Sequence, residues 1–251
     1  MSTRAPARKI WIAVDALERS GDVLGAVTRF AAGPVVELAG LFVEDVDLVT
    51  LAGWPAATET RLFEAAARPF GSAELEATLR AHAAALQRRL DALAREIGVP
   101  WSFRTVRGHI VQQALSLAGG DDWIVLASAT TSVQLRAAPL RTVARPVLWL
   151  LPDDEQGLAQ LQEVAARYDP LGSAERRVVL PADARGAAAI RASVEREGGG
   201  LRSATQAELA QWIACAPRTT GGLVLMTRAA GAADPERLRQ LLRRGAALVL
   251  V

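Results

Sequence analysis

Cysteine, histidine and lysine are nearly absent from this 251-residue chain, which contains one cysteine, two histidines and a single lysine, Lys9. One cysteine excludes an internal disulfide, and so few thiol and imidazole groups leave little from which to build a zinc site. We therefore predict no metal site. Cys215 follows Trp212 and Ile213, a setting that favours a buried small apolar residue over a reactive thiol.

Long apolar runs are also missing. No stretch approaches the roughly 20 residues that a membrane-spanning helix needs, and the start MSTRAPARKI lacks the apolar core of a secretory signal. The hydrophobic content of 51% suffices for one large core or two modest ones. These features predict a cytoplasmic protein that does not contact membranes.

Positive charge is carried almost entirely by arginine, and the net charge is only +2. The densest basic group, Arg237, Arg239, Arg243 and Arg244, falls in a stretch of helical character. No aromatic residues interleave with it, as they would in a surface that stacks on bases. We interpret this group as a solvated helix face and predict no nucleic-acid partner.

Glycine is missing where a phosphate-binding loop would require it. The run Trp123–Ala127 is apolar throughout, which is typical of a strand buried on both faces at the centre of a parallel sheet. Ligands of open α/β sheets lie beyond the carboxyl ends of such strands, so Ser128 and Thr130 form the expected floor of a site. Yet no glycine occurs between Ser128 and Pro146.

The order of patterns along the chain predicts an α/β fold, an open, twisted and mainly parallel sheet with helices on both faces. The expected strands of the first half are Lys9–Val14, Val35–Val43, Trp101–Val106, Trp123–Ala127 and Pro146–Leu151, and the expected helices are Arg19–Ala32, Ser72–Ile97, the stretch after Gly108 and His109, and a turn or two at Pro139–Ala144.

The segment Val46–Gly71 lies outside this alternation and holds three large aromatic residues. We expect Phe63 and Phe70 to pack beneath the long helix. Trp54, beside Pro55, is expected to contact a protein partner or to act as a lid.

Several of these stretches resemble a universal stress protein domain: Asp15 after the first strand, VED at the end of the second, GVPWSFRTVRGHI, DWIVLAS and RPVLWLLP. The resemblance covers about residues 8–152. It implies an adenine-side cleft at Asp15, Val43 and Gly108. ATP-binding members carry Gly-x-x-Gly, nine residues and then Gly-Ser/Thr after the fourth strand, where this chain reads SATTSVQLRAAPLRTVA. The resemblance therefore implies a vestigial nucleotide or anion cleft, and we predict no cofactor, ATP included.

The second half resembles the first in shortened form. RVVLPAD is similar to KIWIAVD, GGLVLMTR to the central strand, and LRRGAALVLV to RTVARPVLWL, with expected helices at Ala187–Arg196 and Gln206–Cys215. We expect a domain over residues 1–152, a docked linker helix over 153–172 and an abbreviated second unit over 173–251. The fifth strands, Val147–Leu151 and Ala247–Val251, are expected to pair antiparallel and form an intramolecular pseudo-dimer, within a monomer or a homodimer.

Two classes of function remain open. The first is a non-catalytic stress-response or regulatory module that acts through protein contacts or a small ligand. The alternative is a nucleotide-binding sensor or nucleotide-dependent hydrolase using the cleft of Asp15, Val43, Gly108 and Ser128. The sequence has no Walker A, Gly-x-Ser-x-Gly or HExxH motif. The candidate acids and bases, Asp15, Glu44, Asp45 and His109, each have simpler structural roles. The pattern favours the non-enzyme, with no catalytic residues.

Overall fold

The computed structural model describes ten segments of the chain and defines one large sheet with flanking helices. The segments are residues 8–15, 35–59, 68–120, 122–127, 147–150, 155–168, 176–179, 202–204, 223–243 and 247–251.

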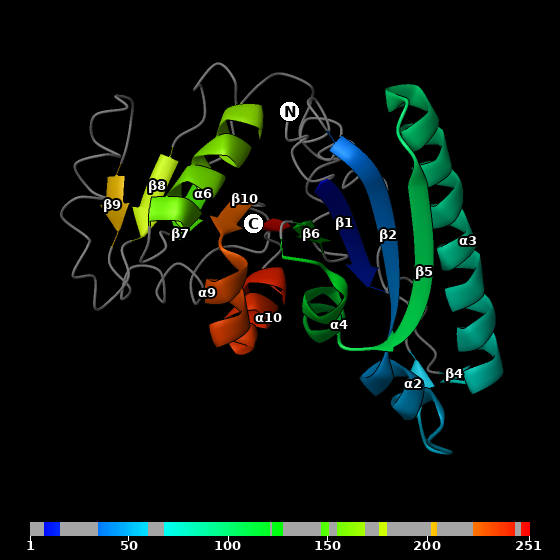
Figure 1. The fold of residues 1–251 in the computed structure, drawn as a ribbon. Helices are drawn as coiled ribbons and strands as arrows, with labels where there is room; N and C mark the ends of the chain where they lie inside the picture. Colours follow the sequence, from blue (N-terminus) through cyan, green and yellow to red (C-terminus); the bar gives the residue numbers. More distant parts are fainter. Residues whose placement is uncertain are drawn as a thin grey trace, which may run out of the picture.

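Nine strands form the large sheet in the order β5-β2-β1-β6-β11-β10-β7-β8-β9 (Figure 1). Their bounds are β1 (Arg8–Asp15), β2 (Val35–Asp45), β5 (Trp101–Gly108), β6 (Trp123–Ala127), β7 (Val147–Leu150), β8 (Arg176–Val179), β9 (Arg202–Ala204), β10 (Leu223–Met226) and β11 (Ala247–Leu250). The predicted α/β class is confirmed.

Strand direction divides this sheet into two blocks. The first block is β5-β2-β1-β6 and the second is β11-β10-β7-β8-β9, and all neighbours within a block are parallel. Between the blocks, β11 pairs antiparallel with β6, with Val249 opposite Val125. The carboxyl ends of the two blocks therefore lie at opposite edges of the sheet.

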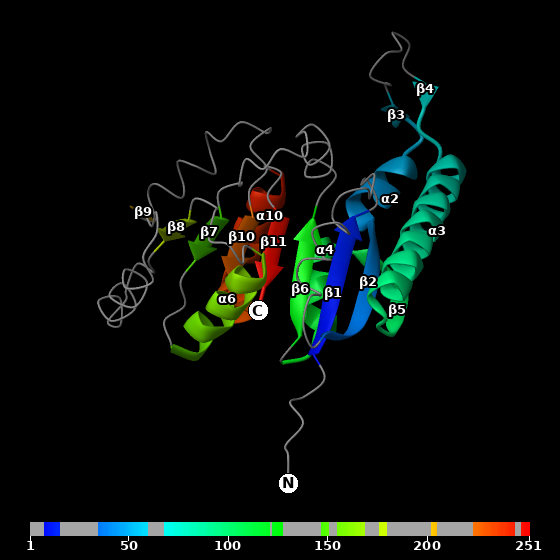
Figure 2. The ribbon, with the colours of Figure 1, turned by 90° about the horizontal axis from the view of Figure 1, so that it is seen from above.

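Helices cover both faces of the sheet, as expected (Figure 2). The helices are α2 (Val46–Ala52), α3 (Ser72–Ile97), α4 (Ile110–Leu117), α6 (Glu155–Tyr168), α9 (Arg228–Ala233) and α10 (Pro235–Arg243). Apolar residues of α3 and α6 join the core on one face, and those of α4 and α10 join the core on the other. Each core contains residues from both blocks.

The strands at the centre of the sheet are apolar on both sides because both of their faces are covered. In β1, Ile10 and Ile12 belong to one core, whereas Trp11 and Ala13 belong to the other. Every residue of β6 is buried, which confirms the interpretation of Trp123–Ala127. One neighbour of β6, however, is antiparallel.

The long helix α3 follows its predicted stripe. The buried leucines recur at three-, four- and seven-residue steps: Leu75, Leu79, Leu86, Leu90 and Leu93. Gly98 ends the helix in the left-handed conformation (φ 72°), where glycine avoids the steric cost of a side chain. Gly71, rather than Ser72, occupies the N-cap position.

The segment Val46–Gly71 forms α2 and a small antiparallel pair, β3 (Thr58–Glu59) and β4 (Arg68–Pro69), which project from one end of the molecule (Figure 2). Phe70 packs against the core beneath α3, as predicted. Trp54 is 63% exposed. Phe63 lies outside the described residues.

The predicted pairing of the fifth strands is wrong. β7 does not touch β11 in the sheet order; it lies between β10 and β8 and is parallel to both. The reason is α6, whose buried stripe includes Leu158, Leu161 and Val164 and which connects β7 to β8 as a crossover helix of a βαβ unit. The stripe itself was predicted correctly.

Four expected helices and two expected site residues fall on other parts of the chain. The helices expected at Arg19–Ala32, Pro139–Ala144, Ala187–Arg196 and Gln206–Cys215, and the site residues Ser128 and Thr130, lie outside the described residues. Among the helices that are described, none combines the length and apolar character needed to cross a bilayer.

We predict that the β6–β11 junction tolerates no charge. In Val249→Asp, a carboxylate replaces a side chain that is fully buried in the core, and we expect the free energy of unfolding to fall by about 3–5 kcal/mol. Urea denaturation measures the change. The matched control Ala229→Asp adds the same group at an exposed position of α9 and should cost less than about 0.5 kcal/mol; equal losses would contradict the importance of the junction.

Candidate functional site

Three of the predicted site residues meet at the carboxyl edge of the first block. Asp15 ends β1 and pairs in register with Val43 of β2, and Gly108 ends β5 opposite Asp45 of β2. Because these strands are adjacent and parallel, residues far apart in the sequence come to one edge.

Val43 and Gly108 occupy different environments at this edge. The Val43 side chain is 1% exposed and packs in the same core as Val111 of α4, so only its backbone faces the edge. Gly108 has φ 150°, and a Cβ placed on it would lie 2.6 Å from Nε2 of Gln113. Position 108 therefore needs glycine for the turn into α4, whether or not a ligand binds.

The phosphate side of the predicted cleft would follow β6. Ala127 is the last residue of β6 and pairs with Val14, the residue before Asp15. Ser128 and Thr130 come directly after it but lie outside the described residues. Their part in the cleft therefore stays a prediction.

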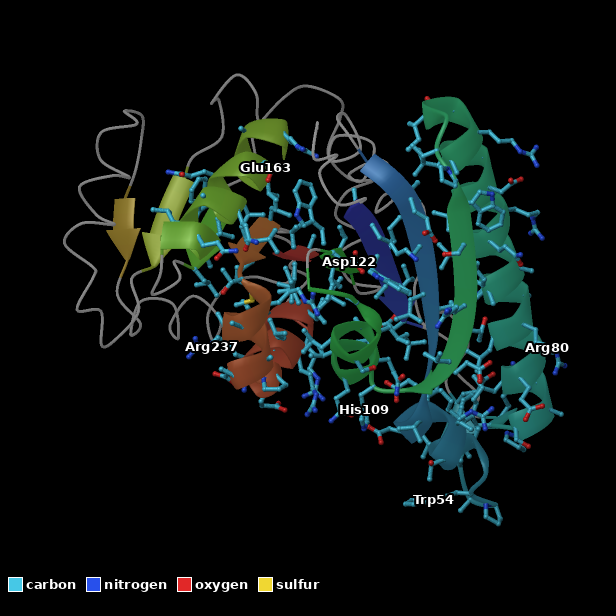
Figure 3. The ribbon with its side chains drawn as sticks, in the orientation of Figure 1. Trp54, Arg80, His109, Asp122, Glu163 and Arg237 are labelled. Atoms are coloured by element: carbon cyan, nitrogen blue, oxygen red, sulfur yellow. The ribbon has the colours of Figure 1, made fainter. Side chains whose placement is uncertain are left out.

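Acidic groups dominate the described part of this edge. Glu44 forms an ion pair with Arg107, at 3.1 Å between Oε2 and Nη2. Asp45 is the N-cap of α2, and its Oδ1 accepts a hydrogen bond of 2.8 Å from the backbone N–H of Asp47. His109, at the N-cap of α4, lies with Nδ1 3.9 Å from Oδ2 of Asp47 (Figure 3).

This arrangement lacks the pairing that activates a nucleophile. Within the described segments, no serine, threonine or cysteine side chain hydrogen-bonds to His109, whose polar neighbour is Asp47. A hydroxyl or thiol nucleophile needs a base within hydrogen-bond reach. The described edge can bind cations or accept hydrogen bonds, but it presents no such pair.

The carboxyl edge of the second block lies at the other end of the sheet. There Thr227 is buried and caps α9 by accepting a hydrogen bond from Ala230 N–H. Arg228 donates through Nη2 to the carbonyl of Ala118 in the first block at 2.7 Å. The Arg228 contact joins the second block to the first, whereas the Thr227 cap stabilises the start of α9 within the second block.

A polar trio connects three strands near the amino ends of the first block. Glu37 of β2 accepts a hydrogen bond of 2.6 Å from Ser102 of β5 and pairs with Lys9 of β1 at 2.9 Å. Burial acts to raise the pKa of Glu37, but Ser102 and Lys9 together outweigh it and leave the pKa below its usual value. The trio is therefore a structural cross-link between strands, remote from the carboxyl edge.

The sequence indicated Asp45 and His109 as separate candidates, but not that both lie close to Asp47. The missing signal was the β2–β5 register, which places Asp45 opposite Gly108 and thereby brings His109 to the start of α2. The acidic run after β2 was visible in the sequence; its neighbour across the sheet was not.

Comparisons with known proteins find likeness among solved structures. No protein-family model and no curated protein matches the chain. Among solved structures it is similar to a universal stress protein from Archaeoglobus fulgidus DSM 4304, with 11% identity over 96% of this chain and 97% of that chain and a TM-score of 0.41. A superposition of this quality does not establish a shared activity.

We predict that Gly108 is needed for the backbone turn and for the space taken by Gln113. Gly108→Ala should lower the free energy of unfolding by about 1–3 kcal/mol, because a side chain at this φ is strained and meets Gln113. In the double variant Gly108→Ala/Gln113→Ala, the free energy of unfolding should recover only the part of the loss that comes from the contact with Gln113. Chemical denaturation of both single variants and the double variant measures the coupling; full recovery would show that the backbone conformation carries no cost.

Proposed function

We propose that the chain is a non-catalytic regulatory or stress-response module of the universal stress type, which acts through protein contacts or a small ligand. The sequence resemblance over residues 8–152 supports this proposal. The first block adds to it, because strands that follow one another in the order β1, β2, β5, β6 lie in the sheet as β5-β2-β1-β6, with β1 and β6 at the switch point.

The observation that carries the proposal is the missing glycine after β6. Between Ser128 and Arg145 the chain offers hydroxyl groups and the cations Arg136 and Arg141, but no glycine. A triphosphate must be met by converging backbone N–H groups, and glycine is what lets the backbone approach it. Hydroxyls and arginines suffice for a single phosphate or sulfate.

The charge of the described edge also opposes a triphosphate. Asp45 and Asp47 lie at the same edge as the positions that would face the nucleotide, and Arg107 at this edge is paired with Glu44. Carboxylates repel phosphate groups unless a cation intervenes. Loss of the phosphate cradle is expected to remove about 4 kcal/mol, roughly a thousandfold in affinity.

We further propose that the chain is a duplicated unit folded as an intramolecular pseudo-dimer. The order β5-β2-β1-β6 has a counterpart in β9-β8-β7-β10, with the same sequence order of strands in each. On this proposal β7 matches β1, β8 matches β2 and β10 matches β6, and the second unit starts before Val147. The match of β8 with β2 replaces the expected likeness of RVVLPAD to KIWIAVD.

We predict that phosphates add nothing to nucleotide binding. AMP and magnesium-ATP should both bind with dissociation constants above about 100 μM, and ATP should not bind tighter than AMP, because no cradle meets the added charges. Titration calorimetry measures both. A dissociation constant for ATP of micromolar or below, lost in Asp15→Ala, would show that other residues replace the loop and would favour a nucleotide sensor.

For protein contacts, we propose the projecting segment around Trp54 as the surface. Leu51 and Trp54 are 44% and 63% exposed, and the backbone N–H of Trp54 bonds to the carbonyl of Leu51 at 3.0 Å. The carbonyl of Trp54 in turn accepts from Ala57. Two large apolar side chains are thus held on an ordered turn, an arrangement suited to a protein partner.

The proposal requires Trp54 to be accessible in the isolated protein. Measured in a Trp212→Phe background, Trp54→Phe should remove most of the tryptophan emission that acrylamide quenches readily, because Trp11, Trp123 and Trp149 are at most 5% exposed. Trp101→Phe, which replaces a half-buried indole, is the control and should leave that fraction largely intact. If Trp54→Phe leaves the quenched fraction unchanged, the side chain is shielded and the surface is not free.

A further inference from the structure

We propose that Asp45, Asp47 and His109 bind one divalent transition-metal ion, such as Zn²⁺. Each residue offers one ligand atom, and the three atoms lie within 4.8 Å of one another. They come from three elements: the end of β2, the first turn of α2 and the residue before α4. This site does not depend on nucleotide binding or on the stress-module proposal.

The donor set is mixed, which distinguishes it from an ordinary acidic surface. Carboxylate oxygen and imidazole nitrogen are both ligand types that zinc binds. The Nδ1 of His109 and the Oδ2 of Asp47 are 3.9 Å apart, beyond a hydrogen bond but within the range that two ligands of one ion can adopt after small side-chain rotations. In Figure 3, His109 is labelled between α4 and α2.

Charge at this position is not balanced by protein cations. In the described segments, neither Asp45 nor Asp47 forms an ion pair with lysine or arginine, since Arg107 binds Glu44 instead. Two carboxylates at this separation repel each other, and a divalent cation between them would relieve that repulsion.

The ligand atoms are available for an ion. Asp45 uses Oδ1 to cap α2, which leaves its second oxygen free to coordinate and fixes the orientation of the carboxylate. His109 occupies the N-cap of α4, where Ser, Thr, Asp and Asn are preferred, yet its imidazole makes no capping hydrogen bond. The ring is directed to Asp47 rather than to the helix.

The imidazole decides which ion fits. Mg²⁺ and Ca²⁺ prefer sites built from oxygen, whereas imidazole suits zinc, nickel and cobalt. Three protein ligands leave at least one coordination position for water or for an anionic group of a ligand. The edge would then change from acidic to nearly neutral when the ion is bound.

Zinc titration tests the site, and the chain offers a matched control because it has only two histidines, His82 and His109. All proteins carry Cys215→Ser, which removes the thiol as a competing ligand. We expect one Zn²⁺ per chain, affinity reduced at least about tenfold in Asp47→Asn and in His109→Asn, and unchanged affinity in His82→Asn. Asp47 is exposed, so its replacement leaves folding intact.

A second measurement follows the two imidazole signals by proton NMR, assigned from the His82→Asn spectrum. Substoichiometric Co²⁺ should shift or broaden the signal of His109 before that of His82. The proposal is overturned if no zinc binds, if His109→Asn binds as tightly as its parent, if His82→Asn loses affinity equally, or if Co²⁺ affects both imidazoles alike. The proposal is also overturned if Mg²⁺ binds as tightly as Zn²⁺ and still binds in His109→Asn, because the site would then be an unspecific acidic surface.

Discussion

The backbone hydrogen bonds between β6 and β11 hold two blocks of parallel strands in one sheet. Their antiparallel direction places the carboxyl edges of the blocks at opposite ends. Because side chains alternate between faces, the same register aligns the apolar residues of both blocks. Val125 and Val249 lie in one core, while Ile124 and Leu250 lie in the other. The two cores are thus continuous across the junction.

Two arginines reinforce the junction from the second block. The guanidinium of Arg167 on α6 lies 4.7 Å from the ring centroid of Trp123 on β6, a cation–π contact over the sheet face. Arg228 donates a hydrogen bond to the carbonyl of Ala118, the residue that follows α4. Together with the strand pairing, these contacts add side-chain links between the two blocks.

Local patterns predicted the elements better than their partners. The leucines of α3, the stop at Gly98 and the buried strand β6 follow from periodicity and backbone preference, which depend on neighbours in sequence. The positions of β7 and β11 in the sheet do not follow from such local patterns. Each is a four-residue apolar strand that could pair with any buried strand of similar length. Reading α6 as a linker rather than as a crossover helix caused the error.

The same limit applies to the site. Strand ends predicted that Asp15, Val43 and Gly108 share an edge, since parallel strands end together. The sequence did not show that the Val43 side chain is buried or that Asp47 faces His109, because both depend on register and on the path of the chain between β2 and β5.

The position of β11 has a consequence for how the chain reaches its folded state. β11 follows every other strand of the second block in sequence, yet it completes the middle of the sheet beside β6. Until it docks, β6 presents an apolar strand with an unpaired edge, the kind of surface through which chains associate wrongly. Pairing β11 with β6 brings together strands far apart in the sequence, and such long-range pairing forms slowly compared with helices. Refolding yield should therefore depend on protein concentration and on chaperones that shield that edge.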